Sequence, residues 1–139
     1  MTTTTLGPPS GLPTYPLATH GKIIGTPYAG THTLYGNWES DNAVDIAVPV
    51  GTPVRAAFSG RIGSQIGSLG SGDPRLAGLR VHVDGPSNSA YYQHLSRLAV
   101  KAGQQVKAGQ IIGYSGAANG VAHLHFAVQR GSPYRYTGR

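Results

Sequence analysis

The sequence contains no cysteine and little charge: only 12% of its 139 residues are Asp, Glu, Lys or Arg. Without cysteine, disulfides cannot stabilise the fold, and any bound metal must be held by histidine and carboxylate side chains. No apolar run is long enough to span a membrane, so membrane insertion is not expected. The N-terminus lacks the basic and apolar segments of a signal peptide, so none is expected.

Acidic residues are especially scarce, with 5 Asp and Glu against 11 Lys and Arg, which gives a formal net charge of +6. A basic protein suits an anionic partner. The basic residues are scattered and are not interleaved with aromatic residues, so nucleic acid is not expected as a partner. An anionic polymer such as a bacterial envelope matches the charge equally well.

The residues that are abundant favour strands and turns. The chain has 21 Gly and 10 Pro together with many Val, Ile, Thr and Tyr, and it shows no long amphipathic helical pattern. We therefore expect an all-β fold. Residues 1–16 are rich in Thr, Pro and Gly and are expected to form a flexible N-terminal segment or linker. Residues 17–139 are expected to fold as one domain, and the protein is expected to be a monomer.

Two histidines stand two residues apart in a segment with the period of a strand, residues 121–129. Leu124 and Phe126 belong to the apolar face of this strand, whereas His123 and His125 point together to the opposite face. The dipeptide Asn119-Gly120 just before it predicts a tight turn. The histidine pair suits a metal, or a metal and a general base. The alternative is a surface strand that carries two histidines by chance.

Asp45 occupies a similar position in residues 43–49, where Val44, Ile46 and Val48 form the apolar face. A carboxylate in such a strand costs free energy unless something pairs with it. A metal is one such partner, and an arginine or a turn amide is the alternative.

The other histidines fall in three settings. His32 lies in a loop with Tyr35, Asn37 and Trp38, which predicts either a wall of a site or ordinary loop packing. His94 lies in a predicted strand, residues 90–95, and shares a face with Tyr92. His82 alternates onto the polar side of the strand at residues 79–84, and we expect it to face solvent. Residues 64–78, rich in Gly and Ser, are expected to form a mobile loop.

Four segments, taken in order, carry a resemblance to a known family. They are residues 44–54 (VDIAVPVGTPV), 92–95 (YQHL), 106–113 (VKAGQIIG) and 123–126 (HLHF). In these motifs the chain resembles the lysostaphin-type zinc endopeptidases, which cut peptide bonds in peptidoglycan, and the resemblance extends over residues 23–130. It implies a small antiparallel β-sheet with a substrate groove bounded by loops. It also implies zinc as the cofactor and peptidoglycan peptide cross-links as the substrate.

The resemblance assigns roles to individual residues. Asp45 and His125 correspond to zinc ligands. His94 and His123 correspond to the two catalytic histidines that do not bind the metal. Tyr92 is expected to support the groove beside His94.

The chain departs from the family pattern at one position. The family usually places a histidine ligand four residues before the aspartate, and this chain has Asp41 there. Asp41 in the site would make it more anionic than is usual for zinc, and its other expected role is to cap a turn. We expect His32 to be the third ligand, because two imidazoles and one carboxylate form a familiar hydrolytic zinc site.

The leading hypothesis is a zinc-dependent endopeptidase that hydrolyses peptide bonds in bacterial peptidoglycan. Its site of action is expected to be extracellular, at the cell wall or in the periplasm. A phage lysin or virion-associated enzyme, and a larger parent polypeptide, are settings that would bring it there without a signal peptide. The alternative, raised by Asp41, is a degenerate domain that binds cell wall or activates a partner without catalysis.

Overall fold

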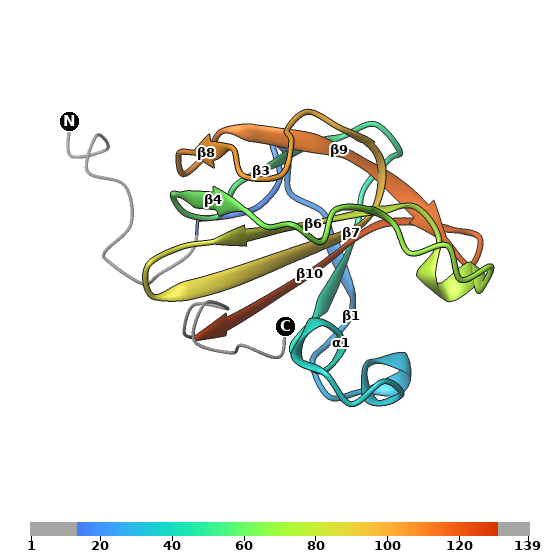
Figure 1. The fold of residues 1–139 in the computed structure, drawn as a ribbon. Helices are drawn as coiled ribbons and strands as arrows, with labels where there is room; N and C mark the ends of the chain where they lie inside the picture. The colour runs from blue at the N-terminus through green and yellow to red at the C-terminus, as the bar shows by residue number, and fades with distance from the viewer. Residues whose placement is uncertain (1–13, 131–139) are drawn as a thin grey trace.

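The computed structural model describes residues 14–130, which form one antiparallel sheet with three short helices (Figure 1). The all-β prediction is therefore confirmed. None of the helices in the described residues is long and apolar enough to cross a membrane. The strands are β1 (Lys22–Gly25), β2 (Val44–Ala47), β3 (Pro53–Arg55), β4 (Gly60–Ile62), β5 (Gly67–Ser68), β6 (Leu79–Asp84), β7 (Asn88–Leu98), β8 (Gln105–Val106), β9 (Ile111–Ala118) and β10 (Val121–Arg130), and the helices are η2 (Gly30–Thr33), α1 (Trp38–Asp41) and η3 (Pro74–Leu76).

Strand β10 lies at the centre of the pairings. The order in the sheet is β1-β2-β10-β9-β7-β6-β4-β8, with β3 beside β9 and β5 beside β6. Along one edge β10 pairs with β2, and along the other it pairs first with β9 and then with β7. The turn between β9 and β10 has positive φ at both Asn119 and Gly120, as the sequence predicted. This turn leads into β10, which places His123 and His125 in the middle of the sheet.

The main core lies on one face of these central strands. Its largest fully buried side chains come from β2, β4, β7, β9 and β10, and valines of β3 and β6 belong to the same core. In Figure 1, β3, β8 and β9 lie on one side of β10, and α1 and η2 lie on the other. Burial of each such aliphatic or aromatic side chain contributes about 1.5–3 kcal/mol. These residues include Ile46, Val54, Val81, Tyr92, Ile112 and Leu124.

The start of the described chain is bonded to the sheet. The Thr14 amide donates to the Ala57 carbonyl over 2.7 Å, and the Arg55 amide donates to the Pro16 carbonyl over 2.7 Å. Of the N-terminal segment expected at residues 1–16, residues 1–13 lie outside the described residues. Its last residues, from Thr14 on, are attached to β3 and the segment after it.

A bulge in β7 changes which of its side chains face the core. Leu79 of β6 pairs with Leu95 and Val81 pairs with Tyr92, so two steps along β6 match three steps along β7. His94, at φ 69°, lies within the bulge. The alternation is shifted there, and His94 leaves the face that Tyr92 occupies.

The prediction that Tyr92 supports the groove beside His94 is therefore wrong. Tyr92 is fully buried in the core, and its hydroxyl accepts a hydrogen bond of 2.8 Å from the Ala57 amide. This burial raises the pKa of the Tyr92 phenol well above its usual range. Its neighbour Tyr91 faces the other side of the sheet and lines the pocket, where Tyr92 was expected.

The prediction that His82 faces solvent is also wrong. Its exposed fraction is 3%, and its Nε2 lies 3.1 Å from Oε2 of Glu39. The polar face of β6 is covered by α1, whose Trp38 ring centroid lies 5.9 Å from that of His82. Periodicity placed His82 on the correct face, but it could not reveal that a helix covers this face.

The segment expected to be a mobile loop, residues 64–78, contains two short elements, β5 and η3. β5 pairs with β6, and η3 begins after Asp73, whose carboxylate accepts from the Arg75 amide over 2.9 Å. This segment forms one wall above the polar face of the sheet, where it approaches the histidines of β7 and β10.

Candidate metal centre

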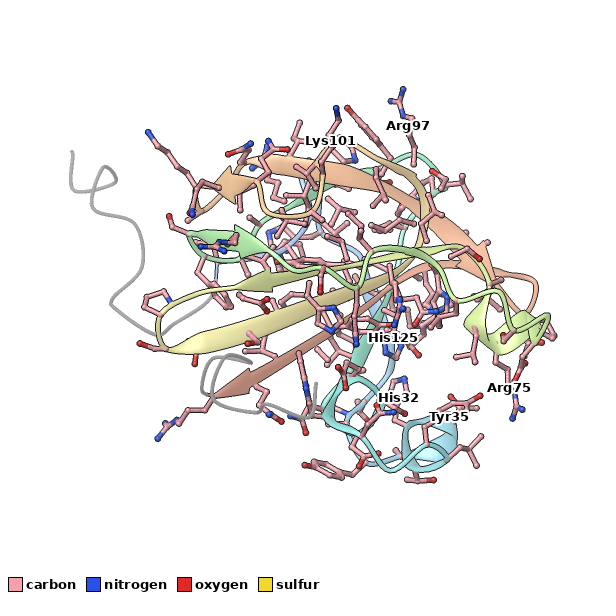
Figure 2. All side chains as sticks on the ribbon, viewed as in Figure 1. His32, Tyr35, Arg75, Arg97, Lys101 and His125 are labelled. Carbon is pink, nitrogen blue, oxygen red and sulfur yellow. The ribbon has the colours of Figure 1, made fainter. Side chains whose placement is uncertain are left out.

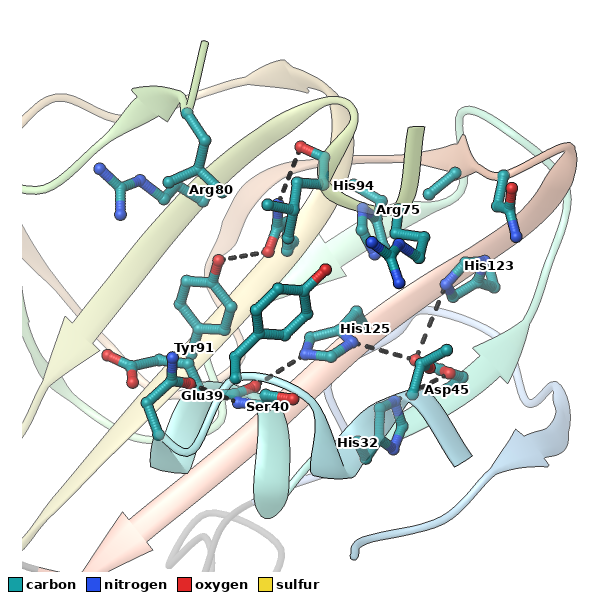
Figure 3. Close-up of a pocket in the computed structure, with 18 of the residues that line it drawn as sticks. His32, Glu39, Ser40, Asp45, Arg75, Arg80, Tyr91, His94, His123 and His125 are labelled. Carbon is teal, nitrogen blue, oxygen red and sulfur yellow. Dashed lines mark hydrogen bonds and ion pairs between the residues drawn. The ribbon is translucent and has the colours of Figure 1, made fainter. Parts of the chain in front are cut away.

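The register of β2 and β10 places Asp45 directly beside His125. Their side chains lie on the polar face of the sheet, with Nδ1 of His125 3.1 Å from Oδ1 of Asp45. Nε2 of His123 lies 3.7 Å from the same oxygen (Figure 3). Gly25 of β1 pairs with Asp45 on the other edge of β2, and a Cβ at position 25 would lie 2.5 Å from Oδ2 of Asp45. Glycine at position 25 thus leaves room for the carboxylate.

His32 approaches the same carboxylate from η2. Its Nε2 lies 3.0 Å from Oδ2 of Asp45, and its ring centroid lies 5.1 Å from that of His125. One ligand atom from each of His32, Asp45 and His125 lies within 4.8 Å of the others, the separation expected around one ion. The structure therefore brings together the three residues that the sequence analysis expected to bind the metal.

Asp41 does not join this group. It is the last residue of α1, and its carbonyl accepts a hydrogen bond of 2.8 Å from the Tyr28 amide. Its Oδ1 is buried and has no hydrogen-bond partner among the described residues. The first turn of α1 is capped instead by Asn37, whose side chain accepts from the Ser40 amide over 2.9 Å. Asp41 thus lies in the helix that borders the site, with its side chain outside the cluster.

Each of the four histidines in the site has one ring nitrogen bonded to a main-chain carbonyl. These contacts are His32 Nδ1 to Thr26, His94 Nδ1 to Ala77, His123 Nδ1 to Val121 and His125 Nε2 to Glu39, all between 2.7 and 2.9 Å. A carbonyl only accepts, so in each neutral ring this nitrogen carries the proton. The second nitrogen of each ring is thereby left with a lone pair.

This arrangement selects the nitrogen that can bind a metal. His32 is left with Nε2 and His125 with Nδ1, the two nitrogens that lie 3.0 and 3.1 Å from the Asp45 carboxylate. Hydrogen bonds of this kind orient metal-binding histidines and increase their basicity. Because two imidazole nitrogens and a carboxylate are preferred zinc donors, the side chains present fit a zinc ion.

Asp45 is held in its ionised form by the same histidines. Burial alone would raise the pKa of its carboxyl group, but the side-chain contact with His125 and the electrostatic effect of His125, His32 and His123 outweigh it. The net result is a pKa below its ordinary value. The carboxylate is therefore available as a ligand at neutral pH.

His94 and His123 lie beside this cluster. The centroid of the His94 ring is 4.9 Å from that of His123 and 5.4 Å from that of His125. Burial lowers the pKa of His94 to about 4, aided by the neighbouring imidazoles and only partly opposed by its hydrogen bond to Ala77 and by Asp45. At neutral pH His94 is therefore neutral, with its Nε2 free to accept a proton. The structure brings together all five predicted site residues.

These residues line a pocket of about 460 Å³. Tyr35 and Asn37 of the loop that carries His32 contribute one wall, as that loop's composition indicated, and Leu76 of η3 contributes to the other. In Figure 2, His32, Tyr35, Arg75 and His125 lie toward one side of the molecule, whereas Arg97 and Lys101 lie at the opposite edge.

The lining residues that the sequence did not indicate include Arg80, Tyr91 and Gln93. The Tyr91 hydroxyl donates to Oε1 of Gln93, and Nε2 of Gln93 donates to the Leu76 carbonyl over 3.2 Å. Gln93 therefore ties β7 to the η3 wall. Its place opposite His125 in the β7–β10 register was available only from the strand pairing.

Comparison with known proteins identifies relatives of this chain. Residues 39–135 match the model of Peptidase family M23. The glycyl-glycine endopeptidase ALE-1 of Staphylococcus capitis is 42% identical over 99 residues, which are 70% of this chain and 26% of ALE-1. The peptidoglycan DD-endopeptidase ShyA of Vibrio cholerae is 36% identical over 95 residues, which are 66% of this chain and 21% of ShyA.

A solved structure has the same fold. A zinc-containing peptidase from Vibrio cholerae superposes with a TM-score of 0.67 and 28% identity, over 86% of this chain and 36% of that one. The chain thus spans about a quarter of ALE-1 and about a fifth of ShyA.

Proposed function

The chain belongs to peptidase family M23, as its sequence motifs indicated, and we propose that it is a zinc-dependent endopeptidase that hydrolyses peptide bonds in bacterial peptidoglycan. The observation that carries the proposal is the convergence of His32, Asp45 and His125 on one point, with His94 and His123 beside it. The names of ALE-1 and ShyA, both endopeptidases, support the reaction class, and ShyA's name supports the substrate.

In this proposal three residues hold the metal. His32 binds through Nε2, His125 through Nδ1 and Asp45 through its carboxylate, because these are the atoms left free by the hydrogen bonds to Thr26 and Glu39. A zinc ion with these ligands would supply Lewis-acid activation of water and of the scissile carbonyl. Two neutral imidazoles and one carboxylate leave the centre net positive, which this activation requires.

The two remaining histidines move the proton. His94 is neutral at neutral pH and presents Nε2, so it can accept the proton that water loses as it attacks the peptide carbonyl. In His123, Nδ1 is bonded to the Val121 carbonyl, and Nε2 faces the cluster at 3.7 Å from Oδ1 of Asp45, beyond hydrogen-bond distance. Once protonated, either imidazole can donate a hydrogen bond to the oxyanion or return the proton to the leaving amine.

The degenerate alternative was raised by Asp41 in place of a histidine. His32 takes the place of the missing histidine, because it brings an imidazole to Asp45 from a different point in the chain. We therefore favour catalysis over simple binding.

The decisive experiment measures metal content and hydrolysis together. We expect about one zinc per chain after reconstitution. A chelator should remove this zinc and thereby abolish hydrolysis, measured as the release of new amino groups from purified cell walls. Zinc well below one per chain after reconstitution would favour the degenerate alternative. If the protein is a phage lysin, its addition from outside should also clear a suspension of susceptible cells.

A further inference from the structure

The charged side chains that line the pocket are not equally paired. The Asp45 carboxylate contacts three histidines, and the Glu39 carboxylate contacts His82 over 3.1 Å. Arg75 is bonded to Asp73, through Nε at 3.2 Å and Nη2 at 3.0 Å. The remaining charged residue of the lining is Arg80, which takes part in none of the ion pairs among residues 14–130.

Arg80 also carries a buried hydrogen-bond donor that lacks an acceptor among residues 14–130. Its Nε is buried and has no hydrogen-bond partner within the described part of the chain. A buried donor without an acceptor lowers stability, and the loss is larger when the donor belongs to a charged group. A ligand that offers an acceptor in the pocket would remove this cost.

The position of Arg80 is fixed by the sheet. Val81 and Val83 of β6 are fully buried in the core, so Arg80 and His82 lie on the pocket face. Figure 3 shows Arg80 at the end of the pocket near Tyr91, with Asp45 and His123 at the other end. A peptide whose scissile bond lies at the metal cluster would therefore extend past Tyr91 toward Arg80.

We propose that Arg80 binds a free carboxylate of the peptide substrate, so that the enzyme selects peptides with a carboxylate near the scissile bond over oligoglycine. This proposal rests on the endopeptidase function proposed above. A guanidinium pairs with a carboxylate through two parallel hydrogen bonds, which gives both affinity and orientation. Stem peptides of peptidoglycan can carry such carboxylates, whereas the interior of an oligoglycine bridge carries none.

The test compares matched peptides with the zinc-loaded protein. One peptide carries a free carboxylate near the scissile bond and its twin carries a carboxamide, with one pair modified at a side chain and another at the C-terminus. Pentaglycine is the third substrate. We expect wild-type kcat/KM to be about 10- to 100-fold higher for the carboxylate peptide of at least one pair, and to be lowest for pentaglycine. The pair that responds identifies which carboxylate is bound.

Substitution of the arginine isolates its contribution. In Arg80→Gln the carboxylate-to-carboxamide ratio should fall to about one. The matched control is Arg97→Gln, because Arg97 lies 4.3 Å over the Tyr114 ring and outside the pocket lining, and this variant should keep the wild-type ratio. Arg75→Gln should change the ratio less than Arg80→Gln, because Asp73 already occupies its guanidinium. Equal cleavage of both twins by the wild type, or an unchanged ratio in Arg80→Gln, would overturn the proposal.

A binding measurement separates this proposal from the endopeptidase function. In the zinc-loaded His94→Ala background, calorimetry should give a Kd for the carboxylate peptide that is about 10- to 100-fold weaker when Arg80→Gln is added. If the wild type cleaves no peptide but this difference in Kd is present, the proposed hydrolysis fails and carboxylate recognition stands. If Kd is the same with and without Arg80, carboxylate recognition fails whatever the protein hydrolyses.

Discussion

Gly78 lies directly against the main chain of His94, and a Cβ at position 78 would be 2.8 Å from the His94 Cα. His94 has a positive φ of 69° at the bulge in β7, and Gly78 has a φ of 87° just before β6. The bulge turns the His94 side chain to the pocket face, and the absence of a side chain at position 78 makes room for it. The position of a proposed catalytic histidine thus depends on a glycine 16 residues earlier in the chain.

We predict that Gly78→Ala destabilises the protein more than Gly72→Ala does. Both glycines have positive φ, which costs alanine about 1–2 kcal/mol. A Cβ at position 72 meets no atom within 4 Å, whereas one at position 78 meets the His94 main chain. Urea unfolding should therefore give a loss of about 1 kcal/mol for Gly72→Ala and at least about 2–3 kcal/mol for Gly78→Ala. Equal losses would show that the contact with His94 has no energetic effect.

The proposed metal site predicts opposite outcomes for two substitutions. His32→Ala should reduce zinc affinity by more than the roughly 10- to 100-fold that loss of a supporting hydrogen bond costs, because a direct ligand is removed. Asp41→Asn is nearly isosteric and lies outside the cluster, so its zinc affinity should stay near that of the wild type. Competition with a chromophoric chelator measures both affinities. Loss of zinc in Asp41→Asn with retention in His32→Ala would mean that Asp41 is the third ligand.

His94→Ala and His123→Ala should each lower kcat while zinc remains bound. General acid–base catalysis contributes typically ~10²–10⁴-fold, and a loss of this size is expected in each variant. Zinc content, measured by atomic absorption on the same samples, should stay near one per chain. If His123→Ala instead loses the metal, the ligand of the His123-Leu124-His125 pair has been assigned to the wrong histidine.

The acidity of His94 can be measured in zinc-free protein. Its pKa is lowered to about 4, chiefly because burial disfavours the imidazolium, so the ring should remain neutral as the pH falls from 7 to 5. The ring proton shifts in NMR spectra should begin to move only near pH 5 and reach their midpoint near pH 4. The same histidine in urea-unfolded protein should titrate near its ordinary value of about 6.5. Coincident titration curves in the two states would refute the prediction.

Much of the site followed from the sequence. A strict period of two in residues 121–129 placed His123 and His125 on one face and Leu124 and Phe126 on the other, and the structure has this arrangement. The same pattern placed Asp45 opposite its apolar neighbours. Side-chain alternation is a local property of extended backbone, so it can be determined without knowing which strands are neighbours.

The sequence also contained the choice between His32 and Asp41, but only as a chemical preference. The distance between His32 and Asp45 is set by the path of the loop from β1 through η2 to α1. That path brings Nε2 of His32 to 3.0 Å from Oδ2 of Asp45. Donor chemistry could rank the two candidates, whereas only the folded loop could bring one of them to the carboxylate.

Tertiary structure alone decided the orientation of Tyr92 and the burial of His82. The bulge at His94 arises from the register in which β7 pairs with β6, so alternation counted along β7 failed there. α1 covers His82 from a distant part of the chain, and Glu39 meets it across 43 positions in the sequence. Local sequence determined which face each strand presents, because the side-chain period is a property of the backbone. Pairing register, bulges and coverage by distant segments determined which of these faces became core, pocket or surface, because those features depend on contacts that exist only once the sheet is assembled.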